Sequence, residues 1–345
     1  MDRIELSIIV PCFNEEQVIR TTNRRLFDEI SKITSDFEIL YVNDGSSDAT
    51  YGILCSLHEE DARAKVINLS RNFGHQIAVS AGLDNAEGNA VVIIDADLQD
   101  PPHLIAAMVD LWRAGSQVVY GRRIKRSGET WFKLATAHWF YSVLNKLSDV
   151  FIPQDVGDFR LLDRRAVLAL RAMPERNRFL RGMASWVGFR QTALDYHRDP
   201  RFAGETKYPL RRMVRLAGDG ILSFSVVPLR VSIWIGLCAA ALSMVGIFYA
   251  LVLRLLTNVW VEGFTLLFVS QLFIGGVQLV FLGVVGEYIG RIFAEVKNRP
   301  LYIVAETRGI EESLQNAVFP RSRLRVLNSR PDNRSESLGL VHAGE

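Results

Sequence analysis

Cysteine is scarce in this chain, and its distribution excludes two kinds of covalent scaffold. Among 345 residues only Cys12, Cys55 and Cys238 occur, with neither disulfide-framework nor zinc-ligand spacing. We therefore expect a reducing compartment. The charge is nearly balanced, with 40 Lys and Arg against 38 Asp and Glu, so no nucleic-acid-binding surplus of positive charge is present. The first residues also lack the pattern of a signal peptide, and we expect no cleaved leader.

Motifs of two common enzyme classes are missing as well. The sequence contains no Gly-x-x-x-x-Gly-Lys-Ser/Thr loop and no Gly-x-Ser-x-Gly elbow. Those absences argue against a P-loop nucleotidase and against a serine hydrolase. No internal repeat is visible either.

Apolar runs alternate with helical patterns over the first third of the chain. The expected strands cover residues 6–10, 37–42, 65–69, 90–94 and 117–120. Such alternation predicts a mostly parallel, Rossmann-like α/β sheet with right-handed crossovers. We expect the alternation to stop after Arg123.

The run Val91-Val92-Ile93-Ile94 is typical of a strand buried on both faces. Asp95 and Asp97 follow it directly, with Gln99 behind them. Ligands bind at the carboxyl ends of strands in open α/β sheets, and these side-chain oxygens suit Mg²⁺ or Mn²⁺. A metal there could neutralise a nucleoside diphosphate. The alternative is that Asp97 or Asp100 only caps the next helix.

Further polar residues follow neighbouring strands. Asp44 lies in a turn that could equally cap a helix, and Glu15 follows the first strand. Several acidic strand ends in one sheet favour a shared site over separate caps. Arg123, Arg201 and Lys207 supply cations suited to phosphate oxygens, although solvated loops would contain such residues too.

Two long segments are nearly free of charge, at 231–253 and 264–286. Each exceeds the roughly 20 apolar residues needed to cross a bilayer, so we expect a membrane hairpin. Arginines flank its outer ends while Arg254 stands alone in the connecting loop, which places the large domain and the C-terminus in the cytoplasm. Residues 131–147 form an aromatic-rich amphipathic segment that suits a membrane interface or, alternatively, ordinary packing on the sheet.

Several motifs, taken together, resemble glycosyltransferase family 2. They are Val10-Pro11-Cys12-Phe13-Asn14-Glu15-Glu16, Val42-Asn43-Asp44-Gly45-Ser46-Ser47-Asp48, Arg71-Asn72-Phe73-Gly74 and Asp95-Ala96-Asp97-Leu98-Gln99-Asp100-Pro101-Pro102. Residues 201–210 and 219–225 narrow the resemblance to polyprenyl-phosphate glycosyltransferases, and the hairpin is most similar to the bactoprenol glucosyltransferase branch. The resemblance covers about residues 5–300.

This resemblance implies a Rossmann-like GT-A catalytic domain with a mostly parallel sheet, interfacial amphipathic helices and a C-terminal two-helix transmembrane hairpin. The expected domains are a GT-A domain at 1–207, a juxtamembrane amphipathic helix at 208–228, transmembrane helices at 229–290 and a cytoplasmic tail at 291–345. The tail loses periodicity from about residue 306, which is typical of partial disorder.

The resemblance also assigns roles to individual residues. It implies Mg²⁺ or Mn²⁺ ligands at Asp95, Asp97 and Gln99, and catalytic residues at Asp97 and Asp158. It implies nucleotide-sugar contacts at Pro11, Phe13, Glu15, Val42, Asp44, Asp95, Ala96 and Arg123. It implies phosphate contacts at Arg123, Arg201 and Lys207. One departure is Arg122, where relatives often have a small residue, and Asp158 could alternatively cap the segment that follows it.

The implied reaction is inverting transfer of a sugar from a UDP-sugar, with UDP-glucose expected, to undecaprenyl phosphate in the bacterial inner membrane. The product would be a lipid-linked sugar donor for modifying cell-envelope glycans. A homo-oligomer is implied, with a tetramer as one form. Alternatives are GDP-mannose or another UDP-sugar as donor, or a soluble or protein acceptor. A processive synthase is disfavoured by the lack of a Gln-x-x-Arg-Trp motif, and a non-catalytic membrane scaffold or flippase component is the alternative from another class.

Overall fold

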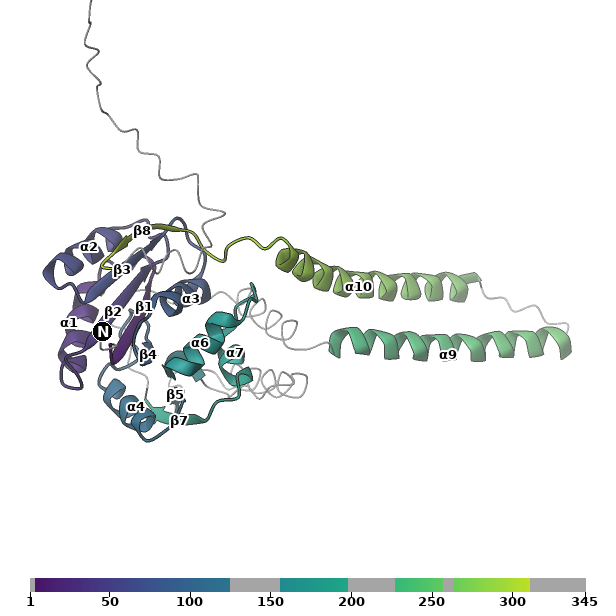
Figure 1. Ribbon diagram of the computed structural model, residues 1–345. Coiled ribbons are helices and arrows are strands. Elements are labelled where there is room, and N and C mark those ends of the chain that lie inside the picture. Colours follow the sequence, from purple (N-terminus) through teal and green to yellow (C-terminus); the bar gives the residue numbers. More distant parts are fainter. Residues whose placement is uncertain (1–3, 125–155, 198–226, 257–263, 311–345) are drawn as a thin grey trace, which may run out of the picture. The chain divides into compact units, whose positions relative to one another are not determined.

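The computed structural model describes residues 4–124, 156–197, 227–256 and 264–310. Its centre is an eight-stranded sheet with the strand order β7-β5-β6-β4-β1-β2-β3-β8 (Figure 1). The strands are β1 (Leu6–Cys12), β2 (Phe37–Asn43), β3 (Ala64–Leu69), β4 (Ala90–Ile93), β5 (Val118–Arg123), β6 (Val156–Asp163), β7 (Gln191–Tyr196) and β8 (Val304–Arg308).

Helices cover both faces of this sheet (Figure 1). One face carries α1 (Ile19–Ile30), α2 (Thr50–Glu60) and α4 (Leu104–Arg113). The other face carries α3 (His75–Asn85), α6 (Arg164–Ala172) and α7 (Leu180–Trp186). Every residue of β1 and β2 is buried, which agrees with the near-continuous apolar runs that a doubly covered sheet requires. The expected α/β fold class is therefore confirmed.

The strand directions differ from a purely parallel sheet at β6 and β8. β1 pairs in parallel with β2 and β4, β2 with β3, and β5 with β7. β6 lies between β4 and β5 and is antiparallel to both. The prediction that regular alternation stops after Arg123 was wrong, because β6, α6, α7 and β7 all follow it. The charged residues Asp158 and Arg160 interrupt the apolar pattern of β6 and conceal the strand.

Residues 304–308, which we expected in the cytoplasmic tail, belong to the sheet. They form β8, which pairs antiparallel with the edge strand β3. Val304 lies opposite Leu69 and Arg308 opposite Val66. The strand is short and mostly polar, so its sequence does not reveal it.

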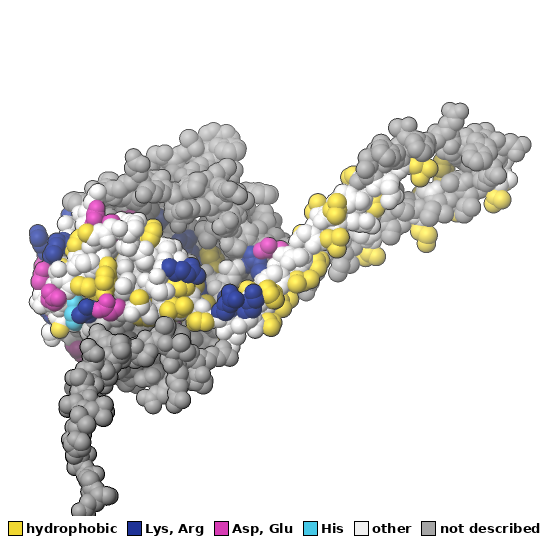
Figure 2. Space-filling model, turned by 90° about the horizontal axis from the view of Figure 1, so that it is seen from above, with side chains coloured by type: hydrophobic (Ala, Val, Ile, Leu, Met, Phe, Trp, Pro, Cys, Tyr) yellow, Lys and Arg dark blue, Asp and Glu magenta, His cyan; other side chains and the backbone are white. Residues whose placement is uncertain are grey.

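Two long helices, α9 (Val227–Leu256) and α10 (Phe264–Val296), contact each other. Within the described part of the chain, Phe273–Val296 is long and apolar enough to cross a membrane. Large apolar side chains are exposed on both helices, and Figure 2 shows them along the visible face. The second expected span, 231–253, lies in α9 and stays a prediction. The segments 131–147 and 208–226 lie outside the described residues.

Candidate active site

The strand ends predicted to form a site do meet at one edge of the sheet. β1, β2 and β4 are parallel neighbours, so the residues that follow them, including Asp44 and Asp95, lie on the same side. β6 runs the opposite way and therefore begins at that edge. Ile93 pairs with Arg160, and extending this register by two residues places Asp158 opposite Asp95. Strand direction thus brings together two carboxylates that are far apart in the sequence.

Asp95 and Asp97 lie in a tight loop directly after β4. Asp97 is buried, and its Oδ1 accepts a hydrogen bond from the backbone N–H of Gln99 at 3.1 Å. Leu98, which lies between Asp97 and Gln99, has φ = 58°, a left-handed conformation that is costly for a branched side chain. Strained residues of this kind are concentrated at functional sites. Helix α4 begins beyond this loop without a side-chain cap, so neither Asp97 nor Asp100 caps it.

Burial raises the pKa of Asp95 to about 6. The positive charge of His75 opposes that shift, whereas the negative charges of nearby carboxylates reinforce it. Those carboxylates belong to Asp100, Asp158 and Asp97. The site therefore concentrates negative charge at one point of the sheet edge, an arrangement that a bound cation would relieve.

Asp158 is the most heavily bonded of these carboxylates. Arg181 donates to it through Nε, at 2.8 Å from Oδ1, and through Nη2, at 3.2 Å from Oδ2. Gln76 Nε2 donates to Oδ2 at 3.1 Å, and His75 Nε2 lies 3.2 Å from the same oxygen. Burial alone would raise the pKa of Asp158, but the charges and hydrogen bonds of Arg181 and His75 bring it well below its usual range. Asp158 is thus held as a carboxylate and does not cap a helix.

His75 links the two acidic groups. Its Nε2 lies 3.7 Å from Asp95 Oδ1 in addition to its contact with Asp158. Burial disfavours the charged imidazolium, but the two carboxylates outweigh it and raise the pKa of His75 to about 9. Sequence reasoning did not identify His75 as a residue of the site. Its place directly after Arg71-Asn72-Phe73-Gly74, at a strand end, was the signal that could have identified it.

Arg123 lies close to Asp100, another carboxylate at this edge of the sheet. Its Nη2 lies 3.8 Å from Asp100 Oδ1, and its Nε donates to the Tyr196 hydroxyl at 3.3 Å. The hydroxyl in turn donates to the buried Asp100. Arg123 can lie here because position 157 is glycine: a Cβ on Gly157 would be 2.7 Å from Arg123 Nη2. Arg123 therefore brings a cation next to the acidic cluster.

Arg122 has different surroundings from Arg123. Its guanidinium is exposed and forms two hydrogen bonds to Asp195 on the surface, at 2.5 and 2.7 Å. The two neighbouring arginines alternate across the pleat of β5, so only Arg123 faces the acidic cluster.

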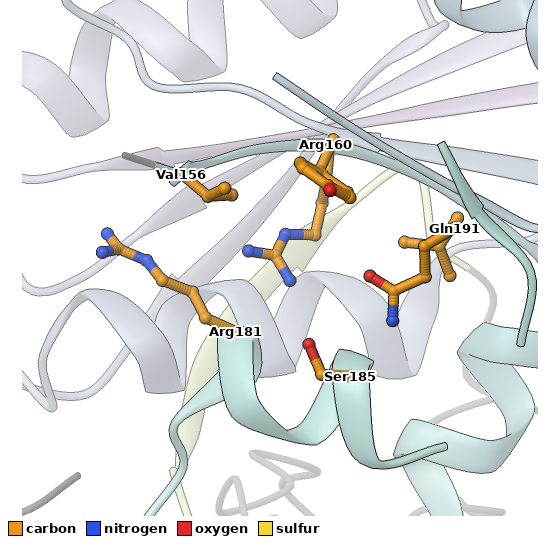
Figure 3. Close-up of a pocket in the computed structure, with 7 residues that line it drawn as sticks. Val156, Arg160, Arg181, Ser185 and Gln191 are labelled. Atoms are coloured by element: carbon orange, nitrogen blue, oxygen red, sulfur yellow. The ribbon is translucent and has the colours of Figure 1, made fainter. Parts of the chain in front are cut away.

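A small cavity of about 10 Å³ lies beside this network, lined by β5, β6, β7 and α7, and has room for about one water molecule. Figure 3 shows Arg160 from β6, Gln191 from β7 and Ser185 from α7 pointing toward it. Burial lowers the pKa of Arg160 to about 10. Arg160 donates to the backbone oxygens of Gly157 and Leu180 at 3.1 and 3.3 Å, and so ties β6 to α7 beside Asp158.

The comparisons with known proteins agree with this geometry. A sequence model of glycosyl transferase family 2 matches residues 7–170, and one of the GtrB C-terminal hairpin matches residues 227–292. The uncharacterized glycosyltransferase YkcC of Bacillus subtilis is 50% identical over 89% of this chain and 95% of that protein. The chain belongs to glycosyl transferase family 2.

This glycosyltransferase is also similar to a bactoprenol glucosyl transferase and, with much lower sequence identity, to a solved structure. The SfII prophage-derived bactoprenol glucosyl transferase of Shigella flexneri is 43% identical over 88% of this chain and 98% of that protein. Among solved structures, glucosyl-3-phosphoglycerate synthase from Mycobacterium tuberculosis, in complex with Mn²⁺, UDP-glucose and phosphoglyceric acid, shows 19% identity. It has a TM-score of 0.40 and covers 64% of this chain and 78% of that one. The hairpin match, together with the apolar helix Phe273–Val296, indicates membrane association of the glycosyltransferase.

The residues predicted to hold the nucleotide sugar differ in exposure. Phe13 is 46% exposed at the end of β1, where an aromatic ring is open to a ligand. Asp44 accepts hydrogen bonds from the backbone N–H groups of Phe73 and Gly74, at 2.7 and 2.9 Å, and so orders the loop after β3 instead of capping α2. Burial is the largest influence on the pKa of Asp44 and raises it, against those hydrogen bonds.

The other residues predicted to contact the nucleotide sugar are buried or partly buried, and the hydrogen bonds seen for them involve backbone atoms. Pro11, Val42 and Ala96 are buried, and the Ala96 carbonyl accepts the Thr22 hydroxyl proton at 2.7 Å. Glu15 is partly exposed, and its backbone N–H donates to the Thr50 hydroxyl at 2.8 Å. Arg201 and Lys207 lie outside the described residues, so their predicted phosphate contacts stay predictions.

The acidic loop of the glycosyltransferase fits a divalent cation held partly by substrate. Within the described ranges there is no group of three or more His, Cys, Asp or Glu side chains placed to hold a metal ion. Mg²⁺ is commonly bound by one or two carboxylates together with substrate phosphates and water. Asp95 and Asp97 meet that requirement, and Gln99 adds an amide oxygen. The residues present therefore fit the expected metal.

Proposed function

We propose that this glycosyltransferase moves glucose from UDP-glucose to undecaprenyl phosphate at the cytoplasmic face of a bacterial inner membrane. The observation that carries the proposal is the match along nearly the whole length of a bactoprenol glucosyl transferase, hairpin included. The acidic sheet edge supports it, because it combines carboxylates for a metal–diphosphate complex with Arg123 for phosphate oxygens.

The proposed reaction is a single in-line displacement. An oxygen of the lipid phosphate attacks C1 of the sugar while the bond between C1 and the diphosphate oxygen breaks, and the electron pair leaves with UDP. A bound divalent ion, held by Asp95, Asp97 and Gln99, would supply charge neutralisation for the diphosphate. Arg123 would bind the phosphate groups and Phe13 the nucleoside.

In this proposal Asp158 orients groups and is not a strong base. Its pKa lies well below the usual range because Arg181 and His75 stabilise the carboxylate against the effect of burial, so its affinity for a proton is low. A strong base is not needed, since a phosphate monoester has its second pKa near ~6 and is largely dianionic at neutral pH. The Arg181–Asp158 pair would instead fix the geometry in which the acceptor phosphate meets the sugar.

The decisive experiment incubates purified full-length protein with undecaprenyl phosphate and one labelled nucleotide sugar at a time, and follows the label into lipid. We expect transfer from UDP-glucose. Asp97→Asn should remain folded but lose nearly all transfer, with turnover reduced about 100-fold or more because charge stabilisation of the leaving group is lost. Transfer only from GDP-mannose would overturn the sugar assignment, and normal turnover of Asp97→Asn would overturn the metal site.

Chelation tests the metal separately. EDTA should abolish transfer, and Mg²⁺ or Mn²⁺ added in excess should restore it, because the diphosphate would otherwise lack its counter-charge. Calorimetry of UDP binding with and without the ion gives an independent measure. Transfer that is unchanged by EDTA would contradict a metal-dependent mechanism.

The domain limits and the orientation of the hairpin belong to the same proposal. The juxtamembrane helix at 208–228 and the spans within 229–290 would hold the catalytic edge near lipid headgroups, with the residues after the hairpin in the cytoplasm. A homo-oligomer, including a tetramer, stays a prediction, as the structure describes a single chain.

A further inference from the structure

The chain that leaves α10 turns back and joins the catalytic domain. We call residues 295–308 the returning segment. Helix α10 ends at Val296, and Asn298, with φ = 44°, adopts the left-handed conformation common just after a helix. The segment then reaches β8 at the edge of the sheet. Besides the β8–β3 pairing and a bond from Tyr51 to Glu306, it makes three contacts on structures that hold an active-site carboxylate.

The first contact is to the loop between α6 and α7. The backbone N–H of Arg176 donates to Glu295 Oε1 at 2.8 Å, and Arg176 Nη2 donates to Asn298 Oδ1 at 3.4 Å. Helix α7 begins four residues after Arg176, and its second residue, Arg181, forms a hydrogen-bonded ion pair with Asp158. The end of α10 is therefore joined to the loop that positions this arginine.

The second contact is to α3. Tyr302 is only 3% exposed, and its hydroxyl donates to Asp84 Oδ2 at 2.9 Å. Asp84 lies in the last turn of α3, whose first residues, His75 and Gln76, contact Asp158. Asp84 and His75 lie at opposite ends of one hydrogen-bonded helix, about 14 Å apart along its axis, so a shift of α3 at Asp84 would displace the residues at the other end.

The third contact is to the loop after β3. The backbone N–H of Ser70 donates to the oxygen of Ile303 at 2.9 Å. Ser70 begins the stretch that leads to Phe73 and Gly74, whose N–H groups bind Asp44. The returning segment therefore also fixes the loop that surrounds the predicted nucleoside site.

We propose that the returning segment is a positioning element for the active site, with Tyr302 as its central positioning residue. It couples the end of the membrane hairpin to α3, to the loop before α7 and to the loop after β3. Correct placement of Asp158 and Asp44 then depends on residues that follow the hairpin in the chain. This inference rests on the proposed roles of these two carboxylates.

The test compares two tyrosines in the full-length protein. Tyr302→Phe removes the hydroxyl that binds Asp84, while Tyr51→Phe removes a hydroxyl that also binds the returning segment, at Glu306, but from α2. Each variant is assayed for kcat, for KM of both substrates and for hydrogen exchange of residues 70–86. Asp84→Asn keeps an acceptor for Tyr302, and Asp84→Ala removes it.

We expect Tyr302→Phe and Asp84→Ala to lower kcat about tenfold or more, because small misplacements of catalytic groups are costly. Amide exchange across residues 70–80 should accelerate, whereas Tyr51→Phe and Asp84→Asn should keep kcat within about threefold of wild type. Wild-type kcat and exchange in Tyr302→Phe would overturn the inference. If wild-type protein moved no sugar to lipid, the proposed function would fail, and the exchange data alone would decide on the returning segment.

Discussion

A partly buried carboxylate that accepts hydrogen bonds from an arginine fork and an amide, and contacts an imidazole, has its oxygens held in fixed directions. Asp158 is such a group, and its partners come from two different helices, Gln76 and His75 from α3 and Arg181 from α7. Hydrogen bonds to a charged group contribute roughly 1.5–3 kcal/mol each to stability, so removing one partner should destabilise the protein as well as misplace the carboxylate.

Arg181→Ala should lower kcat by about 10- to 100-fold, because Asp158 loses both bonds of the guanidinium fork. Arg181→Lys keeps the charge but not the two-pronged geometry, and we expect an intermediate kcat. The measurement is steady-state transfer to lipid, with thermal unfolding recorded in parallel. Arg165→Ala, at a largely exposed site on α6, serves as the control and should behave as wild type. Full turnover in Arg181→Ala would exclude a positioning role.

At this scale the sequence predicted some residues of the site and missed others for a physical reason. Asp44, Asp95 and Asp97 directly follow apolar strands, so local pattern was enough to group them at one edge. Arg181 lies in a helix with no distinctive motif, and it reaches the site only because β6 is antiparallel. His75 was visible in the sequence, but its partner Asp158 could not be placed opposite Asp95 without that strand direction.

Among the secondary-structure elements, α6 shows how a strand end and a helix start can share one residue. Asp163 is the last residue of β6 and the N-cap of α6, where its Oδ1 accepts the backbone N–H of Arg165 at 2.9 Å. Its Oδ2 accepts the indole N–H of Trp112, from α4, at 2.9 Å. One carboxylate therefore joins the helices on opposite faces of the sheet.

Asp163→Ala should destabilise the protein by about 1 kcal/mol through loss of the helix cap. Asp163→Asn should retain most of the stabilisation that the cap provides, because asparagine is also a good N-cap residue. Burial would raise the pKa of Asp163, but the hydrogen bonds from Trp112 and Arg165 lower it below its ordinary value. A carboxylate whose pKa is lower in the folded than in the unfolded protein stabilises the fold at pH values above its unfolded-state pKa, about 3.9. That stabilisation disappears as the pH falls through the folded-state pKa.

The stabilities of wild type and Asp163→Asn, measured by thermal unfolding, should accordingly differ at pH 6, and the difference should shrink as the pH falls through the folded-state pKa of Asp163. A difference that grew as the pH fell would contradict this assignment. Unchanged stability of Asp163→Ala at pH 6 would show that the cap contributes nothing.

The elements that the sequence identified are those with unbroken apolar patterns. β1 to β4 were expected within a few residues of their observed limits, because their patterns are mainly apolar and β1, β2 and β4 are buried along their whole length. β6 carries a buried Arg160 and the carboxylate of Asp158, and β8 is polar and short. Their pairing is decided by contacts distant in the sequence, which a local pattern does not contain.

For the whole molecule, the proposed function requires that the hairpin hold the catalytic edge near the lipid substrate. The positive-inside rule predicts that the arginines on either side of the hairpin face the cytoplasm and that the connecting loop lies on the other side. Helix α10, with 33 residues, is about 50 Å long and exceeds the roughly 30 Å of a bilayer core. Part of it should therefore extend beyond the hydrocarbon region.

This orientation can be tested with a membrane-impermeant thiol reagent on intact cells. In a background where Cys12, Cys55 and Cys238 are replaced by alanine, Asn258→Cys in the connecting loop should be labelled from outside. Asp28→Cys, on the exposed side of α1, should react only after the cells are lysed. Labelling of both or neither in intact cells would contradict a two-span hairpin with a cytoplasmic catalytic domain.

The position of β8 has a consequence for synthesis of the chain. β3 leaves the ribosome early, but the strand that covers its open edge follows both hairpin helices. At 5–20 residues per second, the nascent chain would present that edge, uncovered, for roughly 10–50 s. An unpaired edge strand can recruit other chains, so insertion of the hairpin and completion of the sheet are parts of one biosynthetic sequence.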